Sequence, residues 1–172
     1  MHSVVANAIL MSVLLPSAMA QVSPETAPKR YSLKAMDGTF ATPYSRKVAS
    51  GSALPFDKTY AELTEDQKRL VRSQYESMAE SDEPPYPQAG LAPLYRAVAD
   101  GQQRRGAEGD LSIIVDVDIS GQAIRAAVYA TPDSALGNYV AGVLLKQKYK
   151  PAVCGGQACA MQFPFRIKLK VE

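Results

Sequence analysis

Tryptophan is absent from the 172 residues, histidine occurs once and cysteine twice. The one histidine, His2, stands almost at the start of the chain, whereas catalytic triads and histidine-ligated zinc sites need histidine within the folded domain. Glycine-rich phosphate loops and nucleophile elbows are missing too. Asp116 and Asp118 share one face of a predicted strand, but no histidine or further carboxylate joins them, so we interpret them as solvent-facing. The sequence predicts no enzyme, metal site, cofactor or small-molecule substrate.

An excess of one charge is also missing. Lysine and arginine total 19 and aspartate and glutamate 17, which leaves a net charge of +2. The longest basic cluster is Lys146, Lys148 and Lys150, and its interleaved spacing is typical of the C-terminal end of a helix, where cations are favoured. This pattern gives no reason to expect a nucleic-acid partner.

Residues 1–20 contain no charged side chain, and from Val4 to Leu15 they are almost wholly apolar. With the small residues Ala18-Met19-Ala20 after it, this run predicts a secretory signal peptide cleaved between Ala20 and Gln21. The run of about 12 residues is short of the roughly 20 that a membrane-spanning helix needs. We therefore expect a periplasmic protein. An uncleaved inner-membrane anchor is the alternative, because no lysine or arginine precedes the run.

Cys154 and Cys159 form a close pair, and in an exported protein such a pair is most simply a disulfide. A two-residue turn at Gly156-Gln157 would place the cysteines directly opposite each other in a hairpin. Opposed Cα atoms lie about 4.5 Å apart in a non-hydrogen-bonded pair, within the reach of a disulfide. So short a clip would contribute about 2 kcal/mol.

Changes in composition divide the rest of the chain into three parts. Residues 21–60 are rich in proline, serine, alanine and threonine and predict a flexible leader. Residues 61–101 predict a helical segment, with one helix over 65–80 that opens on a capping box at Thr64 and Gln67. A second, shorter helix is predicted over 91–100 and ends at Gly101.

Residues 102–172 carry the clearest periodicities. Apolar residues occupy the odd positions from Leu111 to Ile119, which predicts a half-buried strand. A second strand follows over 124–129, a helix opens at 131–134, and a last strand with a basic outer face runs over 162–171. The predicted fold class is α+β: a small three-stranded antiparallel sheet in the order β-β-α-β with a packed helix, preceded by one or two helices.

These motifs, taken in order, resemble the C-terminal domain of the energy transducer TonB. The resemblance rests on Glu108-Gly109 entering the first strand, Gly121 turning the hairpin, and Tyr149-Lys150-Pro151-Ala152 before the last strand. It covers about residues 102–171. A full transducer of the family needs a membrane anchor and a long spacer, whereas this chain has a predicted cleavable signal peptide and a leader of about forty residues. This departure would let the protein bind a partner without transducing force.

The resemblance implies a module that binds an extended peptide of an outer-membrane receptor by adding it to a sheet edge, in or beside TonB-dependent transport. Unpaired backbone groups make any sheet edge a template for such pairing, with a peptide or with a second copy as a homodimer. We expect the last strand to be that edge, and its basic side chains to favour an acidic partner. The predicted partner-binding residues are Gln162, Phe163, Arg166, Lys168 and Lys170. The alternative is a free periplasmic structural protein that keeps the fold and binds envelope components through residues 65–100.

Overall fold

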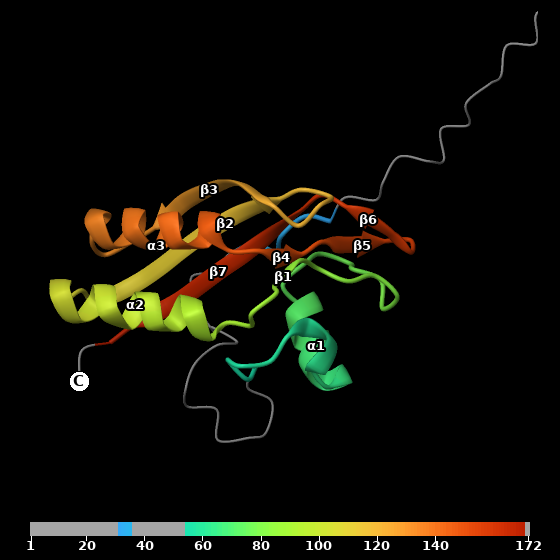
Figure 1. The fold of residues 1–172 in the computed structure, drawn as a ribbon, viewed down its shortest axis with the longest axis horizontal. Helices are drawn as coiled ribbons and strands as arrows, with labels where there is room; N and C mark the ends of the chain where they lie inside the picture. Colours follow the sequence, from blue (N-terminus) through green and yellow to red (C-terminus); the bar gives the residue numbers. More distant parts are fainter. Residues whose placement is uncertain (1–30, 36–53, 171–172) are drawn as a thin grey trace, which may run out of the picture.

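The computed structural model describes residues 31–35 and 54–170, and these form a mixed α/β fold (Figure 1). The described helices are the 3₁₀ turn η2 (Tyr60–Glu62), α1 (Glu65–Arg72), α2 (Ala92–Arg105) and α3 (Ser134–Lys146). The strands are β1 (Tyr86–Pro87), β2 (Gly109–Val117), β3 (Ala123–Ala130), β4 (Tyr149–Lys150), β5 (Ala152–Cys154), β6 (Gln157–Cys159) and β7 (Met161–Leu169). The predicted α+β class and three-stranded antiparallel sheet are confirmed.

The main sheet has the strand order β3-β2-β7, so β2 is central and the other two strands are edges. β2 and β7 pair without interruption from Gly109 opposite Leu169 to Val117 opposite Met161. Two smaller antiparallel sheets, β1 with β4 and β5 with β6, complete the described strands. Figure 1 shows the β5–β6 hairpin at the end of the molecule where β7 begins.

The core lies between one face of the main sheet and the helices α2 and α3. The odd-numbered residues of β2 and β7 point to this face, and all of them except Gly109 are buried. The two helices pack closely at Gly101, where a Cβ atom would lie 2.6 Å from the Leu136 side chain. The sequence predicted that this helix ends at Gly101, and that prediction is wrong. The helix continues to Arg105 and ends at Gly106, which has the left-handed φ of +60°.

The first predicted helix is shorter than expected. Its capping box is confirmed, since the Thr64 hydroxyl accepts a hydrogen bond from the Gln67 N–H and the Gln67 side-chain oxygen accepts one from the Thr64 N–H. The helix ends at Arg72 instead of continuing to residue 80. Tyr75 leaves the helical path to form an antiparallel bridge with Leu33, so a contact distant in sequence overrides the local helical spacing.

The predicted strand boundaries also shift. β2 starts at Gly109 and ends at Val117, so the predicted last member of the strand, Ile119, stands exposed in the turn. The side chains of β3 do not alternate regularly between the two faces of the sheet, because the pairing with β2 shifts twice. Each shift leaves one residue of β3 without a partner on β2, and these residues are Ile124 and Tyr129.

A second, smaller apolar cluster forms where β5 and β6 meet Tyr31 and Tyr75. Residues 32–34 hold this end of the molecule together: the Lys34 N–H donates to the Gln74 carbonyl (3.0 Å) and the Glu76 N–H donates to the Ser32 carbonyl (2.9 Å). Within residues 31–35 and 54–170, no helix is long and apolar enough to cross a membrane. The predicted signal peptide and its cleavage site at Ala20 and Gln21 lie outside the described residues.

Candidate functional site

The outer edge of β7 is the surface to which the sequence assigned peptide binding. Backbone groups of an antiparallel strand point alternately toward and away from its partner. The carbonyl of Gln162 accepts from the Tyr75 hydroxyl (2.7 Å) and that of Lys170 from Gln102 Nε2 (2.9 Å), so both carbonyls point away from β2. By the same alternation, the outward groups of β7 belong to its even-numbered residues.

Pro164 is one of these even-numbered residues, so its backbone nitrogen points away from β2. This position explains how a proline is accommodated in a strand that pairs with β2 over nine residues. Its missing N–H would cost a hydrogen bond if it pointed toward β2, whereas at an edge no ladder bond is lost. Tyr75 and Gln102 occupy carbonyls at the two ends of the edge. Between these two contacts, the outward backbone groups of β7 are those of the even-numbered residues from Pro164 to Lys168.

The five predicted binding residues divide according to the face of β7 on which they lie. Phe163 is only 1% exposed and packs against the Tyr149 ring at 5.4 Å between centroids, so its side chain belongs to the core. Lys168 and Lys170 are exposed. Gln162 and Arg166 are half-buried and are already engaged. Gln162 Nε2 donates to Asp116 Oδ1 (3.0 Å), and the Arg166 guanidinium lies 3.5 Å from the Lys34 carbonyl.

The two aspartates of β2 and its turn have structural partners. Asp116 forms an ion pair with Arg125 of β3 at 2.6 Å. Asp118 accepts from the Ser120 hydroxyl (2.7 Å) and from the Gln122 N–H (2.9 Å), which fixes the β2–β3 turn. The hydrogen bond from the Ser120 hydroxyl, followed by that from the Gln122 backbone, holds the pKa of Asp118 below its ordinary value.

The predicted disulfide between Cys154 and Cys159 is confirmed, with the Cα atoms 5.9 Å apart. The predicted turn is wrong by one residue. Cys154 pairs with Gln157 in the ladder, so the turn residues are Gly155 and Gly156, with φ of +58° and +81°. Positive φ at both central positions is the signature of a type I′ turn, which two glycines adopt without strain. The cysteines are diagonal neighbours on one face of the hairpin, not directly opposed.

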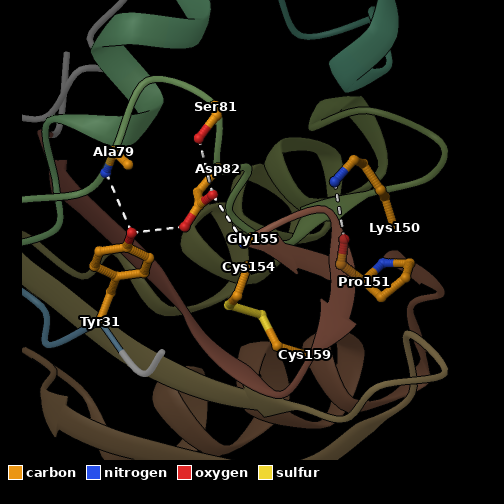
Figure 2. Close-up of a disulfide and its surroundings, with 9 residues drawn as sticks. All are labelled: Tyr31, Ala79, Ser81, Asp82, Lys150, Pro151, Cys154, Gly155 and Cys159. Carbon is orange, nitrogen blue, oxygen red and sulfur yellow. Dashed lines mark hydrogen bonds between the residues drawn. A yellow bond between two sulfur atoms is a disulfide. The ribbon is translucent and has the colours of Figure 1, made fainter. Parts of the chain in front are cut away.

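A buried carboxylate beside this hairpin escaped the sequence analysis. Asp82 is 2% exposed and accepts hydrogen bonds from the Tyr31 hydroxyl (2.6 Å) and the Gly155 N–H (3.0 Å). Figure 2 shows Asp82 between these two groups, with the disulfide next to it. The Tyr31 hydroxyl in turn accepts from the Ala79 N–H (3.3 Å). These partners are distant in sequence and carry no motif, so no local pattern indicated them.

Two of the motifs on which the family resemblance rests are in contact. Gly121 has a φ of +82°, and a Cβ atom on it would lie 2.1 Å from the Tyr149 carbonyl oxygen. The Gly121 carbonyl accepts from the Tyr149 N–H (3.0 Å). The hairpin turn is therefore pressed against the segment 149–151 that precedes the last strand, and only glycine permits this approach.

Neither the known protein-family models nor the curated proteins include a match to this chain. The resemblance to TonB C-terminal domains thus rests on the ordered motifs. Within the part of the chain that the structure describes, no cluster of three or more histidine, cysteine, aspartate or glutamate side chains is arranged to hold a metal ion.

Proposed function

We propose that the protein is a periplasmic, TonB-like module that binds an extended peptide of an outer-membrane receptor along β7, in or beside TonB-dependent transport. The observation that carries the proposal is the position of β7 at the edge of the main sheet, in an uninterrupted nine-residue register with β2. A regular edge strand is the structural requirement for adding a peptide strand. Among the described residues, no strand pairs with β7 on its outer side.

The arrangement of motifs supports the same proposal. Under it, β2, β3, α3 and β7 form the β-β-α-β unit of the family, and β4, β5 and β6 are additions between α3 and β7. The contact between Gly121 and Tyr149 gives the two family motifs a shared structural purpose, since it joins the hairpin turn to the segment leading into the last strand.

The charges of this edge favour an acidic peptide. Lys168 and Lys170 are exposed, and no salt bridge involves either of them within the described part of the chain. An approaching carboxylate would gain attraction and a faster encounter from these ammonium groups. The backbone between Pro164 and Lys168 would supply the hydrogen bonds, and Phe163 would hold the strand in place from the core side.

The test is titration of the isotope-labelled protein with an extended, acidic peptide, followed by backbone amide shifts. The proposal expects the largest shifts at residues 162–170 and weaker binding in Lys168→Glu. The matched control is Lys58→Glu, which makes the same charge change at another exposed lysine outside the main sheet. An equal loss of peptide affinity in both variants would show that only the overall charge of the protein matters. Amide shifts confined to residues 65–100 would overturn the proposal in favour of binding through the helices.

A further inference from the structure

Residues 73–80, which follow α1, have the sequence of a helix but do not form one. No glycine or proline stands between Glu65 and Glu83, and five of the eight residues 73–80 are glutamine, glutamate, methionine or alanine, which favour a helix. Tyr75 and Ala79 also continue the apolar spacing of Val71. Contacts with other parts of the chain therefore end α1 at residue 72.

The observed conformation of this segment is locally unfavourable. Ser77 has a φ of +50° and is the one non-glycine residue with a positive φ in residues 31–35 and 54–170. This left-handed region is crowded for any residue that has a Cβ atom. Such residues persist only where the surrounding structure holds them in place. A contact from outside the segment must therefore stabilise it.

Residues 31–34 supply that contact through hydrogen bonds to three backbone groups of the segment. These groups are the Gln74 carbonyl, which accepts from the Lys34 N–H (3.0 Å), the Glu76 N–H, which donates to the Ser32 carbonyl (2.9 Å), and the Ala79 N–H, which donates to the Tyr31 hydroxyl (3.3 Å). Figure 2 shows the Tyr31 hydroxyl between Ala79 and Asp82. Tyr31 and Leu33 also pack with Tyr75 in the second apolar cluster.

The same backbone groups would have other partners in a longer helix. If α1 continued through residue 80, the Glu76 N–H would donate to the Arg72 carbonyl and the Ala79 N–H to the Tyr75 carbonyl. One N–H cannot donate a strong bond in both directions at once. Docking of residues 31–34 and extension of α1 therefore exclude each other.

We propose that residues 73–80 are a conformational switch controlled by residues 31–34. In the docked state, which the structure holds, the segment is bridged to residues 31–34 and α1 stops at residue 72. In the released state α1 continues to about residue 80. Docking contributes the bridge and the packing of Tyr31 and Leu33, whereas release removes the positive φ of Ser77 and restores the helical bonds.

The switch reaches the edge of the main sheet through Tyr75. In the docked state the Tyr75 hydroxyl donates to the outward carbonyl of Gln162 at the start of β7 (2.7 Å). Extension of α1 takes Tyr75 off its bridge with Leu33 and withdraws the hydroxyl from that carbonyl. Under the proposed function the released state offers a peptide one more acceptor. The switch itself requires no peptide and does not depend on that function.

The first test releases residues 31–34 in protein expressed from the full 172-residue sequence. Tyr31→Ala with Leu33→Ala removes the docking side chains, which lie outside the main core. Carbon chemical shifts of residues 73–80 should move to helical values, and the carbonyl carbon of Gln162 should move upfield as it loses its hydrogen bond. Unchanged amide shifts in α3 check that the fold is intact. Residues 73–80 that stay non-helical in an intact fold would overturn the proposal.

The second test leaves residues 31–34 unaltered and shifts the balance at Ser77. Alanine disfavours the docked φ and favours a helix, whereas glycine does the reverse, so the Lys34 amide should exchange with solvent about tenfold faster in Ser77→Ala than in Ser77→Gly. Ser73 is the matched control, because its φ of −62° is right-handed in both states. The same two substitutions at Ser73 should give nearly equal rates. Equal rates in the Ser77 pair would overturn the proposal, as would the same ratio in both pairs.

Discussion

The two edges of the main sheet are built in opposite ways. β7 keeps a continuous register with β2, carries Pro164 and the exposed Lys168, and has carbonyls near its ends bonded to Tyr75 and Gln102. β3 is interrupted twice and exposes Ile124 and Tyr129. The first edge is regular in its backbone and polar in its side chains, whereas the second is irregular and apolar.

This difference shows that one sheet can present two unlike edges. A regular polar edge offers backbone hydrogen bonds to an extended chain and lets charge select it. A bulged apolar edge interrupts the backbone ladder and offers side-chain contacts instead. Changes on one edge should therefore leave the other intact, and the predictions below test that separation.

The largest contrast is expected between two isoleucines, one on each edge strand. Ile167 of β7 is buried and Ile124 of β3 is exposed. Ile167→Ala should lower the free energy of unfolding by about 2–5 kcal/mol, because it leaves a cavity in the core. Ile124→Ala should change it by no more than about 0.5 kcal/mol. Urea denaturation of both variants measures the contrast. Similar losses would show that β3 is as integrated into the core as β7.

A smaller but substantial effect is expected at Gly121, where the hairpin carrying β3 meets Tyr149. Gly121→Ala introduces strain at positive φ and a clash with the Tyr149 carbonyl, and should destabilise the fold by more than about 1 kcal/mol. Gly106→Ala is the control, since it has a φ of +60° but no atom within 4 Å of the added Cβ. The difference in thermal unfolding between the two variants isolates the contact. Equal losses would assign the whole effect to backbone strain.

Tyr75→Phe should lower the stability of the fold modestly and strengthen peptide binding. The lost hydrogen bond to the Gln162 carbonyl should cost about 1 kcal/mol in chemical denaturation. The same change releases an outward carbonyl of β7, so under the proposed function an acidic peptide should bind more tightly by calorimetry. Weaker peptide binding in this variant would indicate that Tyr75 holds β7 in the shape that the peptide needs, instead of competing with the peptide for the Gln162 carbonyl.

The smallest effect is expected in acid, at the helix that covers the β3 side. Asp133 caps α3 and pairs with Arg105, and the hydrogen bond from Arg105 is the main reason that the pKa of Asp133 is lowered from 3.8. A carboxylate with a lowered folded-state pKa stabilises the fold above its unfolded pKa and loses that contribution as pH falls through the folded value. Arg105→Gln should therefore lower the melting temperature slightly at pH 7 and less at pH 2. An equal loss at both pH values would show that the ion pair contributes nothing.

The parts of the fold that the sequence predicted are those controlled by local chemistry. Four of these features follow from residues close in sequence. They are the Thr64 capping box, the start of α3 near Asp133, the pairing of Cys154 with Cys159, and the strand that comes after the two cysteines. Each of these features combines a short-range pattern with a single favoured geometry.

The parts that were missed depend on contacts between distant residues. Gly101 signals a helix stop, but the approach of Leu136 makes it a packing position within α2. Tyr75 fits a helical stripe, but its bridge to Leu33 ends the helix earlier. In the candidate site, the sequence indicated the strand and its basic side chains. It could not show that Phe163 faces the core or that Tyr75 and Gln102 bond the edge, because those facts require the neighbours in space.

The link between Tyr31 and Asp82 has a mechanical consequence. Tension applied to the chain before residue 31 would load the Tyr31 hydroxyl bond to Asp82 and the two backbone bonds between residues 32–34 and 74–76 before it reached the main sheet. Asp82 also bonds the Gly155 N–H in a hairpin that the disulfide closes covalently. Residues 31–34 would therefore detach first, while the clipped hairpin keeps its shape and both sheet edges stay in place.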